Sequence, residues 1–233
     1  FFDHPEKKLK VIGVTGTKGK STICEMIRHT LCKSGIPAGS IGTVGVRIGD
    51  VTRPTGNTTP ESYELFKIFD EMVRCGMRYA VMEVSSQGIK MDRIFGISFF
   101  AAVMTNLSED HIGTGEHPDF DDYKNTKMKL FERATHCIFN ADDRYFSEFL
   151  PHAAGKVHTY ATQHEADITA ADIIPTAKHG TFGTAFTPVE KELSHAEIYL
   201  PHPGNFSVSN ALSALSVCKL VGISPEKAGE ALA

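Results

Sequence analysis

A lysine and a hydroxyl side chain, Lys20 and Ser21, stand next to each other in a glycine-rich turn near the start of the sequence. The turn, residues 15–21, follows the apolar run 11–14 and leads directly into a helix-like pattern. Small residues let backbone N–H groups approach phosphate oxygens, lysine adds a mobile positive charge, and a serine oxygen can bind Mg²⁺. The turn is therefore a candidate phosphate-binding loop, although glycines that merely join a strand to a helix would look similar.

The spacing of this loop departs from the common pattern G-x-x-x-x-G-K-[ST]. Five positions before Gly19 stands Val14, and the other glycines are at positions 13 and 16. The Gly-Lys-Ser sequence nevertheless lies at the switch from strand to helix, where the helix dipole favours a bound anion. We therefore predict a phosphate loop of a particular kind rather than the generic one.

Two further side chains that can bind a metal stand at or after the ends of apolar, strand-like runs. Glu83 lies in the run 78–84, and His111 follows the run 99–104. Ligands of parallel sheets sit beyond the carboxyl ends of the strands, so both side chains would lie near Lys20. Mg²⁺ prefers oxygen ligands. From the residues alone, however, Glu83 could equally form a salt bridge at the sheet edge, and a lone histidine is more often structural.

Three lysines, Lys124, Lys127 and Lys129, fall within the helix-like segment 119–132. Acidic residues at the start of this segment suit the positive end of a helix dipole. From spacing alone we interpret the lysines as a solvated helix face, because long charged side chains keep their ends in water.

The alternation of apolar runs with helix-like segments predicts an α/β fold with a P-loop-type, mostly parallel sheet flanked by helices. Between residues 166 and 200, short β-like pieces separated by Gly and Pro predict a small antiparallel appendage. We expect strands over residues 78–84, 99–104, 137–140 and 157–161, and a hairpin turn at Gly49-Asp50. We expect helices over residues 22–33, from a cap at residues 58–61 to residue 75, over 119–132 and 207–220, and from residue 225 onward.

Composition limits the class of protein. A chain of 233 residues with 41% hydrophobic and 22% charged residues is ordinary for a globular protein, and we interpret it as one domain, residues 1–233. No apolar run approaches the roughly 18 residues of a membrane helix, and a net charge of -4 argues against a broad nucleic-acid surface. The five scattered cysteines indicate neither disulfides nor a thiolate metal site, which fits a reducing cytoplasm. The chain begins without Met and stops within a helical pattern, so we expect a fragment of a longer protein.

Five stretches stand in a fixed order along the chain: TGTKGKST, NTTPES, MEVSSQGIKMDRIFGISFFAAVMTNLSEDH, YKNTKMKLF and HPGNFSVSNALSA. In order and spacing they resemble the central domain of the Mur ligases, and most closely the MurE-type branch, the UDP-N-acetylmuramoyl-tripeptide synthetases. The resemblance covers nearly the whole chain. It implies the central ATP-binding domain of a three-domain enzyme, whose N-terminal domain holds the uridine end of the substrate and whose C-terminal domain brings the amino acid.

The resemblance implies a role for each matching residue. It implies contacts with ATP at Gly16, Thr17, Lys18, Gly19, Lys20, Ser21, Thr22 and Asn210. It implies catalytic roles for Lys20, Glu83, His111 and Lys127, and metal contacts at Ser21, Glu83, His111 and Lys127. It implies that the UDP-sugar peptide is held at Thr58, Thr59, Ser85 and Arg93, where an arginine suits a pyrophosphate.

Lys127 matches the carbamylated lysine of the family. An amine kept neutral by its surroundings can capture CO₂, and the resulting carbamate offers oxygen ligands to Mg²⁺. The resemblance thus replaces the solvated interpretation for Lys127, but not for Lys124 or Lys129. Three positions depart from the usual pattern: Lys18 where Asn is common, Gln87 where His is common, and Ser207 where many relatives have a second Asn.

The implied activity is ATP-dependent amide ligation in peptidoglycan precursor synthesis, with ATP and Mg²⁺, by a cytoplasmic and monomeric enzyme. A carboxylate of the UDP-N-acetylmuramoyl peptide attacks the γ-phosphate to give an acyl phosphate and ADP, and the amine of an amino acid then displaces phosphate. The resemblance does not imply which amino acid is added, whether lysine, diaminopimelate or another. Two alternatives are a relative of folylpolyglutamate synthetase, whose loop typically reads GTNGKGS, and a non-ligase, Mur-like nucleotide-binding subunit.

Overall fold

One mixed sheet runs through the computed structural model, which describes residues 2–110, 112–113, 116–178, 180–191 and 193–233. The twelve strands found there have the order β11-β10-β9-β8-β7-β6-β1-β5-β2-β3-β4, and β12 pairs with β10. The strands are β1 (Lys10–Thr15), β2 (Ala38–Gly42), β3 (Gly45–Ile48), β4 (Val51–Arg53), β5 (Tyr79–Glu83), β6 (Phe99–Met104), β7 (Ala134–Asn140), β8 (Lys156–Ala161), β9 (Ile168–Lys178), β10 (Thr181–Glu190), β11 (Leu193–Ser194) and β12 (Ile198–Leu200).

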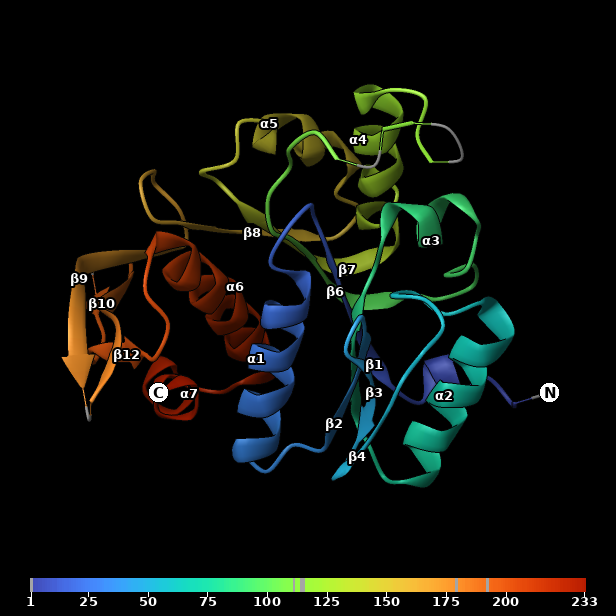
Figure 1. Cartoon of the computed structure of the whole chain (residues 1–233), viewed down its shortest axis with the longest axis horizontal. Helices are drawn as coiled ribbons and strands as arrows, with labels where there is room; N and C mark the ends of the chain where they lie inside the picture. Colours follow the sequence, from blue (N-terminus) through green and yellow to red (C-terminus); the bar gives the residue numbers. More distant parts are fainter. Residues whose placement is uncertain (1, 111, 114–115, 179, 192) are drawn as a thin grey trace.

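Helices cover both faces of this sheet. In Figure 1, α1, α6 and α7 lie on one side of the central strands, and α2 and α3 lie on the other. The helices are α1 (Lys20–Lys33), α2 (Ser62–Arg74), α3 (Ser86–Lys90), α4 (Phe120–Met128), α5 (Phe146–Phe149), α6 (Asn205–Val221) and α7 (Pro225–Leu232). Three short 3₁₀ turns are η1 (Pro5–Lys7), η2 (Phe131–Arg133) and η3 (Leu150–His152). The predicted mostly parallel α/β fold is confirmed.

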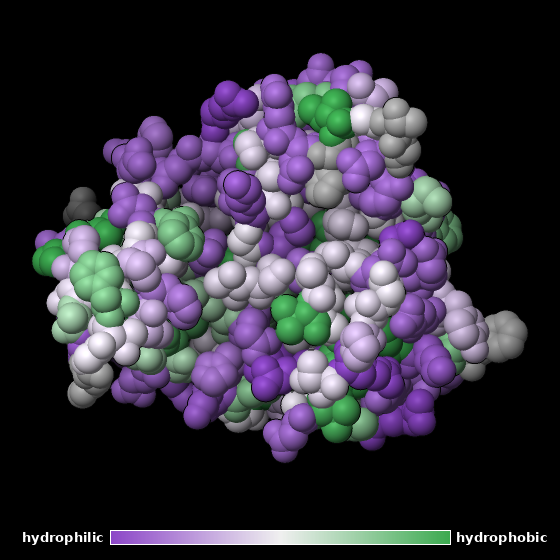
Figure 2. Space-filling model, viewed as in Figure 1, coloured by the Kyte–Doolittle hydropathy of each residue, from purple (hydrophilic) through white to green (hydrophobic). Residues whose placement is uncertain are grey.

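Each face of the sheet has its own apolar core, because successive side chains of a strand point to opposite faces. In β1, Val11 packs in the core under α2 and α4, whereas Ile12 and Val14 pack in the core under α1 and α6. Outside these cores, apolar residues on the face shown in Figure 2 form small separate patches rather than one continuous area. Within the described residues, no helix combines the length and apolar character needed to span a bilayer.

The centre of the sheet fixes where three connecting segments emerge. β1 pairs in parallel with β5 on one side and with β6 on the other, so that Val14 lies level with Glu83 and Val103. Because parallel strands end at the same edge, the segments after β1, β5 and β6 leave the sheet side by side. Such a switch point is where ligands of doubly wound sheets bind.

The expected antiparallel strands between residues 166 and 200 are present, and they extend the main sheet. β9 pairs antiparallel with β10, and β10 with β12, whereas β9 joins β8 in parallel at Tyr160 and Ile168. The hairpin turn at Gly49-Asp50 is confirmed, since β3 and β4 pair antiparallel on either side of it.

Three expected helix boundaries were wrong. α1 begins at Lys20 rather than at residue 22, because Gly19 adopts a φ of 88° and serves as its N-cap. α2 begins at Ser62, and its N-cap Glu61 makes no side-chain capping bond. The threonines of the expected cap at residues 58–61 instead form hydrogen bonds with other segments, Thr58 with Thr43 and Thr59 with Glu83. α4 ends at Met128, and a 3₁₀ turn follows where Phe131 enters the core.

A carboxylate in the turn after β7 holds the turn after β8. Asp142 accepts hydrogen bonds from the backbone N–H groups of residues 162–164 and from the Thr162 hydroxyl. Burial opposes its charge, but these donors and His164 outweigh burial and hold the pKa of Asp142 below its usual value. The next residue, Asp143, accepts the Leu107 N–H at 2.7 Å and so ties this corner to the segment after β6.

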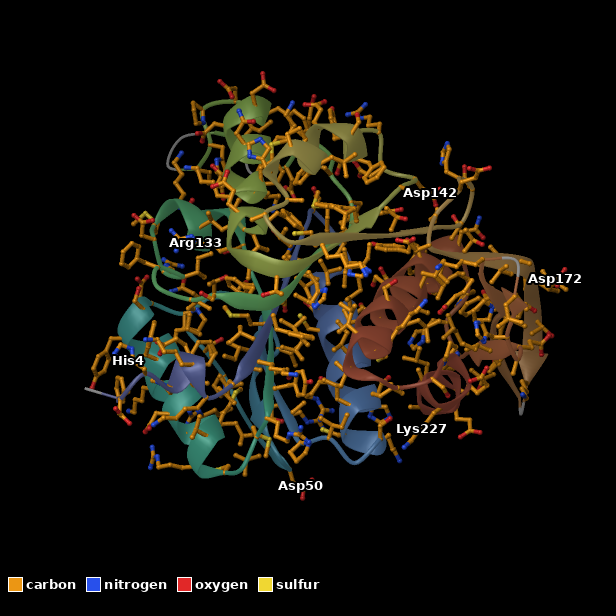
Figure 3. The ribbon with its side chains drawn as sticks, turned by 180° about the vertical axis from the view of Figure 1, so that it is seen from behind. His4, Asp50, Arg133, Asp142, Asp172 and Lys227 are labelled. Atoms are coloured by element: carbon orange, nitrogen blue, oxygen red, sulfur yellow. The ribbon has the colours of Figure 1, made fainter. Side chains whose placement is uncertain are left out.

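Asp142→Ala should lower the free energy of unfolding by about 2–3 kcal/mol at neutral pH, because several donors lose their acceptor. Since the folded pKa lies below the unfolded value of about 3.9, the Asp142 contribution is complete above that pH and disappears as the pH falls through the folded pKa. Denaturant titrations of both proteins at several pH values measure this contribution of Asp142 to the free energy of unfolding. Asp50→Ala, at the opposite end of the molecule (Figure 3), is the control. An equal loss in both variants would contradict this account.

Candidate functional site

The predicted phosphate loop is a four-residue turn between β1 and α1. Two of its glycines have backbone angles that favour glycine, with φ of 138° at Gly16 and 88° at Gly19. A Cβ on Gly16 would lie 1.9 Å from the Thr105 hydroxyl oxygen, and one on Gly19 would lie 2.8 Å from the Asn210 side-chain oxygen. Other parts of the chain therefore approach the loop so closely that only glycine fits.

The segment after β6 holds this loop in place. Asn106 accepts the Thr17 N–H with its backbone oxygen at 2.8 Å and the Lys18 N–H with its side-chain oxygen at 3.0 Å. The Thr105 hydroxyl donates to the Lys18 carbonyl at 2.7 Å, and the Thr17 hydroxyl donates to the Ser108 carbonyl at 3.1 Å. The loop is thus braced by hydrogen bonds that do not require a ligand.

The Lys20 ammonium folds back over the loop. Its Nζ donates to the carbonyl oxygens of Gly16 and Thr17, both at 2.9 Å. Burial lowers the pKa of Lys20, and the carboxylates of Glu83 and Asp110 partly offset that effect. The cation lies at the loop, as the sequence predicted, and Asp110 is a nearby charge that the sequence interpretation missed.

Ser21 and Glu83 meet beside this lysine. The Ser21 hydroxyl donates to Glu83 Oε1 at 2.8 Å, and the Thr43 backbone N–H donates to the same oxygen at 2.8 Å. Glu83 is 2% exposed, and among the described residues it forms no ion pair, so the edge salt bridge considered from the sequence is not what forms. A Cβ on Gly42 would lie 2.2 Å from Glu83 Oε1, so the carboxylate fills space that glycine leaves open.

Lys127 is buried, contrary to the solvated helix face that spacing alone predicted. Its side chain is 1% exposed, and its Nζ donates to the Gly16 carbonyl at 3.2 Å. Burial lowers the pKa of Lys127 well below its ordinary value, and the positive charge of Lys20 lowers it further. Lys124 instead pairs with two carboxylates of its surroundings, and Lys129 is exposed.

A pocket of about 200 Å³ opens beside the two lysines. It is lined by Lys20, Asn57, Thr58, Ser85, Ser86, Gln87, Arg93, Glu116 and Lys127. Three of the four residues expected to hold the substrate, Thr58, Ser85 and Arg93, therefore line one cavity with the site lysines. A second pocket of about 270 Å³ includes both Ser21 and Glu83 in its lining.

Thr59, the fourth of those residues, lies beneath the pocket rather than in its wall. It is fully buried, and its hydroxyl donates to the Glu83 carbonyl at 3.1 Å and accepts the Ser85 N–H at 3.0 Å. Its own carbonyl accepts a hydrogen bond from Arg93, whose guanidinium also pairs with Glu61 at 2.6 Å. Thr59 therefore supports residues of the wall.

The remaining expected residues are placed as follows. Asn210 lies in α6 with its side-chain oxygen against Gly19, at the start of α1. His111 lies outside the described residues. Among the residues that are described, no group of three or more His, Cys, Asp or Glu side chains is arranged to hold a metal ion. Next to the loop, the Ser21 hydroxyl and the buried Glu83 carboxylate are oxygen groups that could contact a metal ion.

Comparison with models of known families identifies the family of this chain. The family model described as the Mur ligase middle domain matches residues 14–218. The chain belongs to this family. In this middle domain, Lys20 and Lys127 both donate to the Gly16 carbonyl of the glycine-rich loop, and Ser21, at the start of α1, donates to Glu83.

Curated relatives of this middle domain are named as ligases. The chain is 38% identical over 232 residues to "UDP-N-acetylmuramoyl-L-alanyl-D-glutamate--2,6-diaminopimelate ligase 1" of Clostridium acetobutylicum. It is 39% identical over 233 residues to the corresponding ligase of Caldanaerobacter subterraneus subsp. tengcongensis. Each alignment covers 100% of this chain and 47% of the relative. The chain thus spans about half the length of the curated relatives it matches.

Solved structures show the same fold. A structure titled "Structure of UDP-N-acetylmuramoyl-L-alanyl-D-glutamate--2, 6-diaminopimelate ligase" superposes with a TM-score of 0.86 at 27% identity, covering 96% of this chain and 46% of that one. MurF from Acinetobacter baumannii gives 0.75 at 21% identity, covering 98% and 47%. The complex titled "FPGS-AMPPCP-folate complex" gives 0.78 at 16% identity, covering 100% and 64%. The last two likenesses show the fold alone.

Gly16→Ala should destabilise the chain by more than about 2 kcal/mol, because the added methyl group meets Thr105 at 1.9 Å in a backbone conformation that already disfavours alanine. Gly35→Ala is the matched control. Gly35 has a φ of 79°, and nothing lies within 4 Å of an added Cβ, so only backbone strain of about 1 kcal/mol should appear. Thermal unfolding of both variants measures the difference, and similar losses would contradict the close approach of Thr105.

Proposed function

We propose that the chain binds Mg²⁺-ATP and is the central ATP-binding domain, residues 1–233, of an ADP-forming amide ligase that extends a UDP-N-acetylmuramoyl peptide in peptidoglycan precursor synthesis. One observation carries this proposal. Lys20, the Ser21–Glu83 pair and Lys127 converge on one glycine-rich loop at the carboxyl end of β1. The names of the curated relatives support the class of reaction.

The donor set fits Mg²⁺. Ser21 Oγ and Glu83 Oε1 are 2.8 Å apart, and within the part of the chain that the structure describes the donors to this carboxylate are uncharged: the Ser21 hydroxyl and the N–H and hydroxyl of Thr43. Lys20 is the cation near this buried carboxylate, and a divalent ion between them and the phosphates would offset the negative charges further. Ser21 and Glu83 would therefore hold the metal ion together with phosphate oxygens. When bound, Mg²⁺ supplies charge neutralisation at the transferring phosphate.

The loop and its lysine fit the phosphates of ATP. The backbone N–H groups of the first turn of α1, residues 20–22, lie at the positive end of this helix, where an anion is favoured. Lys20 is held at this turn by two carbonyls that a stronger acceptor, a phosphate oxygen, would replace. Asn210 beside Gly19 is placed at the edge of the loop, where the resemblance puts the adenine.

The pocket beside the lysines fits the acceptor substrate. Arg93 offers a cation for the pyrophosphate, while Thr58 and Ser85 offer hydroxyl groups, and Thr59 supports this wall from beneath. The chemistry needs a substrate carboxylate aligned with the γ-phosphate, so these side chains bind and orient while Lys20 offsets the negative charges that meet. The names of the relatives make 2,6-diaminopimelate the first amino acid to test.

Lys127 is proposed to carry a carbamate. Burial lowers the pKa of Lys127 and so favours its neutral amine, and that amine can bond to CO₂ and release the proton to solvent. The role of His111 at a second metal remains a prediction. We propose a monomer that works in the reducing cytoplasm, without nucleic-acid or membrane partners, and with uridine and amino-acid sites in domains of a longer polypeptide.

Lys20→Ala should lower phosphoryl transfer by at least about 10²–10³-fold, because it removes the main protein cation at the phosphates. Lys33→Ala, an exposed residue in the last turn of the same helix, is the control and should retain activity. The assay measures ADP release by a polypeptide of the relatives' length in the presence of the UDP-peptide and diaminopimelate. Near-normal turnover by Lys20→Ala would refute the role of this lysine. ADP release that depends on a folate, or on neither substrate, would favour one of the alternative functions.

Carbamylation of Lys127 should be visible in ¹³C NMR after addition of ¹³C-bicarbonate. Because burial lowers the pKa of Lys127 and deprotonation yields the reactive amine, the carbamate signal should increase as the pH rises. Lys127→Arg should abolish the signal, whereas Lys124→Arg, which keeps a cation beside Asp121 and Glu148, should retain it. A signal that survives in Lys127→Arg would contradict the assignment.

A further inference from the structure

Tyr123 stands between two groups that the proposed function uses. It lies in α4 one turn before Lys127, so both side chains leave the same face of the helix. The two side chains are 0% and 1% exposed. The Tyr123 hydroxyl contacts the loop residue Thr17, and its ring contacts Lys127. One side chain therefore touches both the phosphate loop and the buried amine.

The hydroxyl contact has a direction that follows from counting hydrogen bonds. Thr17 Oγ1 donates to the Ser108 carbonyl at 3.1 Å and accepts the Ser108 N–H at 3.0 Å. A threonine hydroxyl has one hydrogen and two acceptor positions. The Tyr123 hydroxyl, 3.2 Å away, therefore donates to the remaining position. This bond joins α4 to the loop and to the segment after β6 at a single oxygen atom.

The ring contact sets the direction of the amine. Lys127 Nζ lies 4.5 Å from the ring centroid and donates to the Gly16 carbonyl at 3.2 Å. The ring is itself packed against His117, with centroids 5.3 Å apart at an interplanar angle of 72°. His117 is fixed in turn, because its Nδ1 is 2.7 Å from the Asp122 carboxylate, which pairs with Lys90. Residues of α3 and α4 thus hold the ring that faces the amine.

We propose that Tyr123 is a positioning residue of the nucleotide site, which keeps Thr17 and the Lys127 amine at a fixed separation through its hydroxyl and its ring. This inference rests on the proposed function, since positioning has a measurable consequence only if the loop binds Mg²⁺-ATP. Tyr123 acts through its neighbours and not on the reacting groups. Its hydroxyl and its ring can be removed in turn, which distinguishes positioning from general support of the fold.

Tyr123→Phe removes only the hydroxyl. We expect the Kd for Mg²⁺-ATP, measured by calorimetry on this chain, to rise about five-fold, which corresponds to the loss of one neutral hydrogen bond. A double-mutant cycle with Thr17→Val should be non-additive, because both changes remove the same bond. Tyr145→Phe is the matched control. The Tyr145 ring packs on Phe120 of α4, with ring centroids 5.1 Å apart, and this change should leave the Kd unchanged.

Tyr123→Leu removes the ring as well. It should raise the Kd beyond the Tyr123→Phe value and weaken the ¹³C-carbamate signal of Lys127, which Tyr123→Phe should keep. All titrations are run at a temperature where circular dichroism shows every variant to be folded. Unchanged Kd values in both variants, or additive effects with Thr17→Val, would overturn the inference while leaving the proposed function intact. Failure of the wild-type chain to bind Mg²⁺-ATP would overturn both.

Discussion

Two lysine side chains donate from Nζ to one backbone carbonyl, that of Gly16, and the arrangement of the site depends on this shared contact. Like charges brought together away from water repel each other, and each therefore favours its neutral form. Burial is the first cause of the lowered pKa of both Lys20 and Lys127, and the charge of Lys20 lowers the pKa of Lys127 further, so two cations held here carry a cost. A group with several negative charges relieves it, and a triphosphate held by the loop is such a group. The site thus has the electrostatic character of a receptor for a polyanion.

The sheet is what brings these charges together. Because β1 lies between β5 and β6, the loop after β1 has Glu83 on one side and residues 105–108 on the other. α4 contacts the same loop through two side chains: Tyr123 contacts Thr17, and Lys127 donates to Gly16. None of these contacts joins residues that are close in sequence, apart from Lys20 with its own loop. Gly16 allows Thr105 to approach the loop, and Gly42 allows Glu83 to approach β2, since a methyl group at either glycine would overlap that neighbour.

How much of this could be predicted from the sequence depends on how local each feature is. The loop with Lys20 and Ser21, and β6 with both of its ends, follow from patterns within a few residues. The cap proposed at residues 58–61 failed because Thr59 binds the end of β5, which no local pattern reveals. The burial of Lys127 was hidden for the same reason: helix spacing shows which residues share a face, but not what covers that face. Thr43 and Asn106 were missed because each contributes a backbone group as well as its side chain, and the type of residue does not reveal the partner of a backbone group.

The central claim is that the loop, the lysines and the Ser21–Glu83 pair form one site for a metal-bound triphosphate. Calorimetric titration of ATP into the wild-type chain, with Mg²⁺ and then with a chelator in its place, tests it most directly. The account predicts saturable one-to-one binding that weakens at least about ten-fold without the metal, a difference of 1.4 kcal/mol or more. Binding of equal strength in both conditions, or no binding with Mg²⁺, would contradict it.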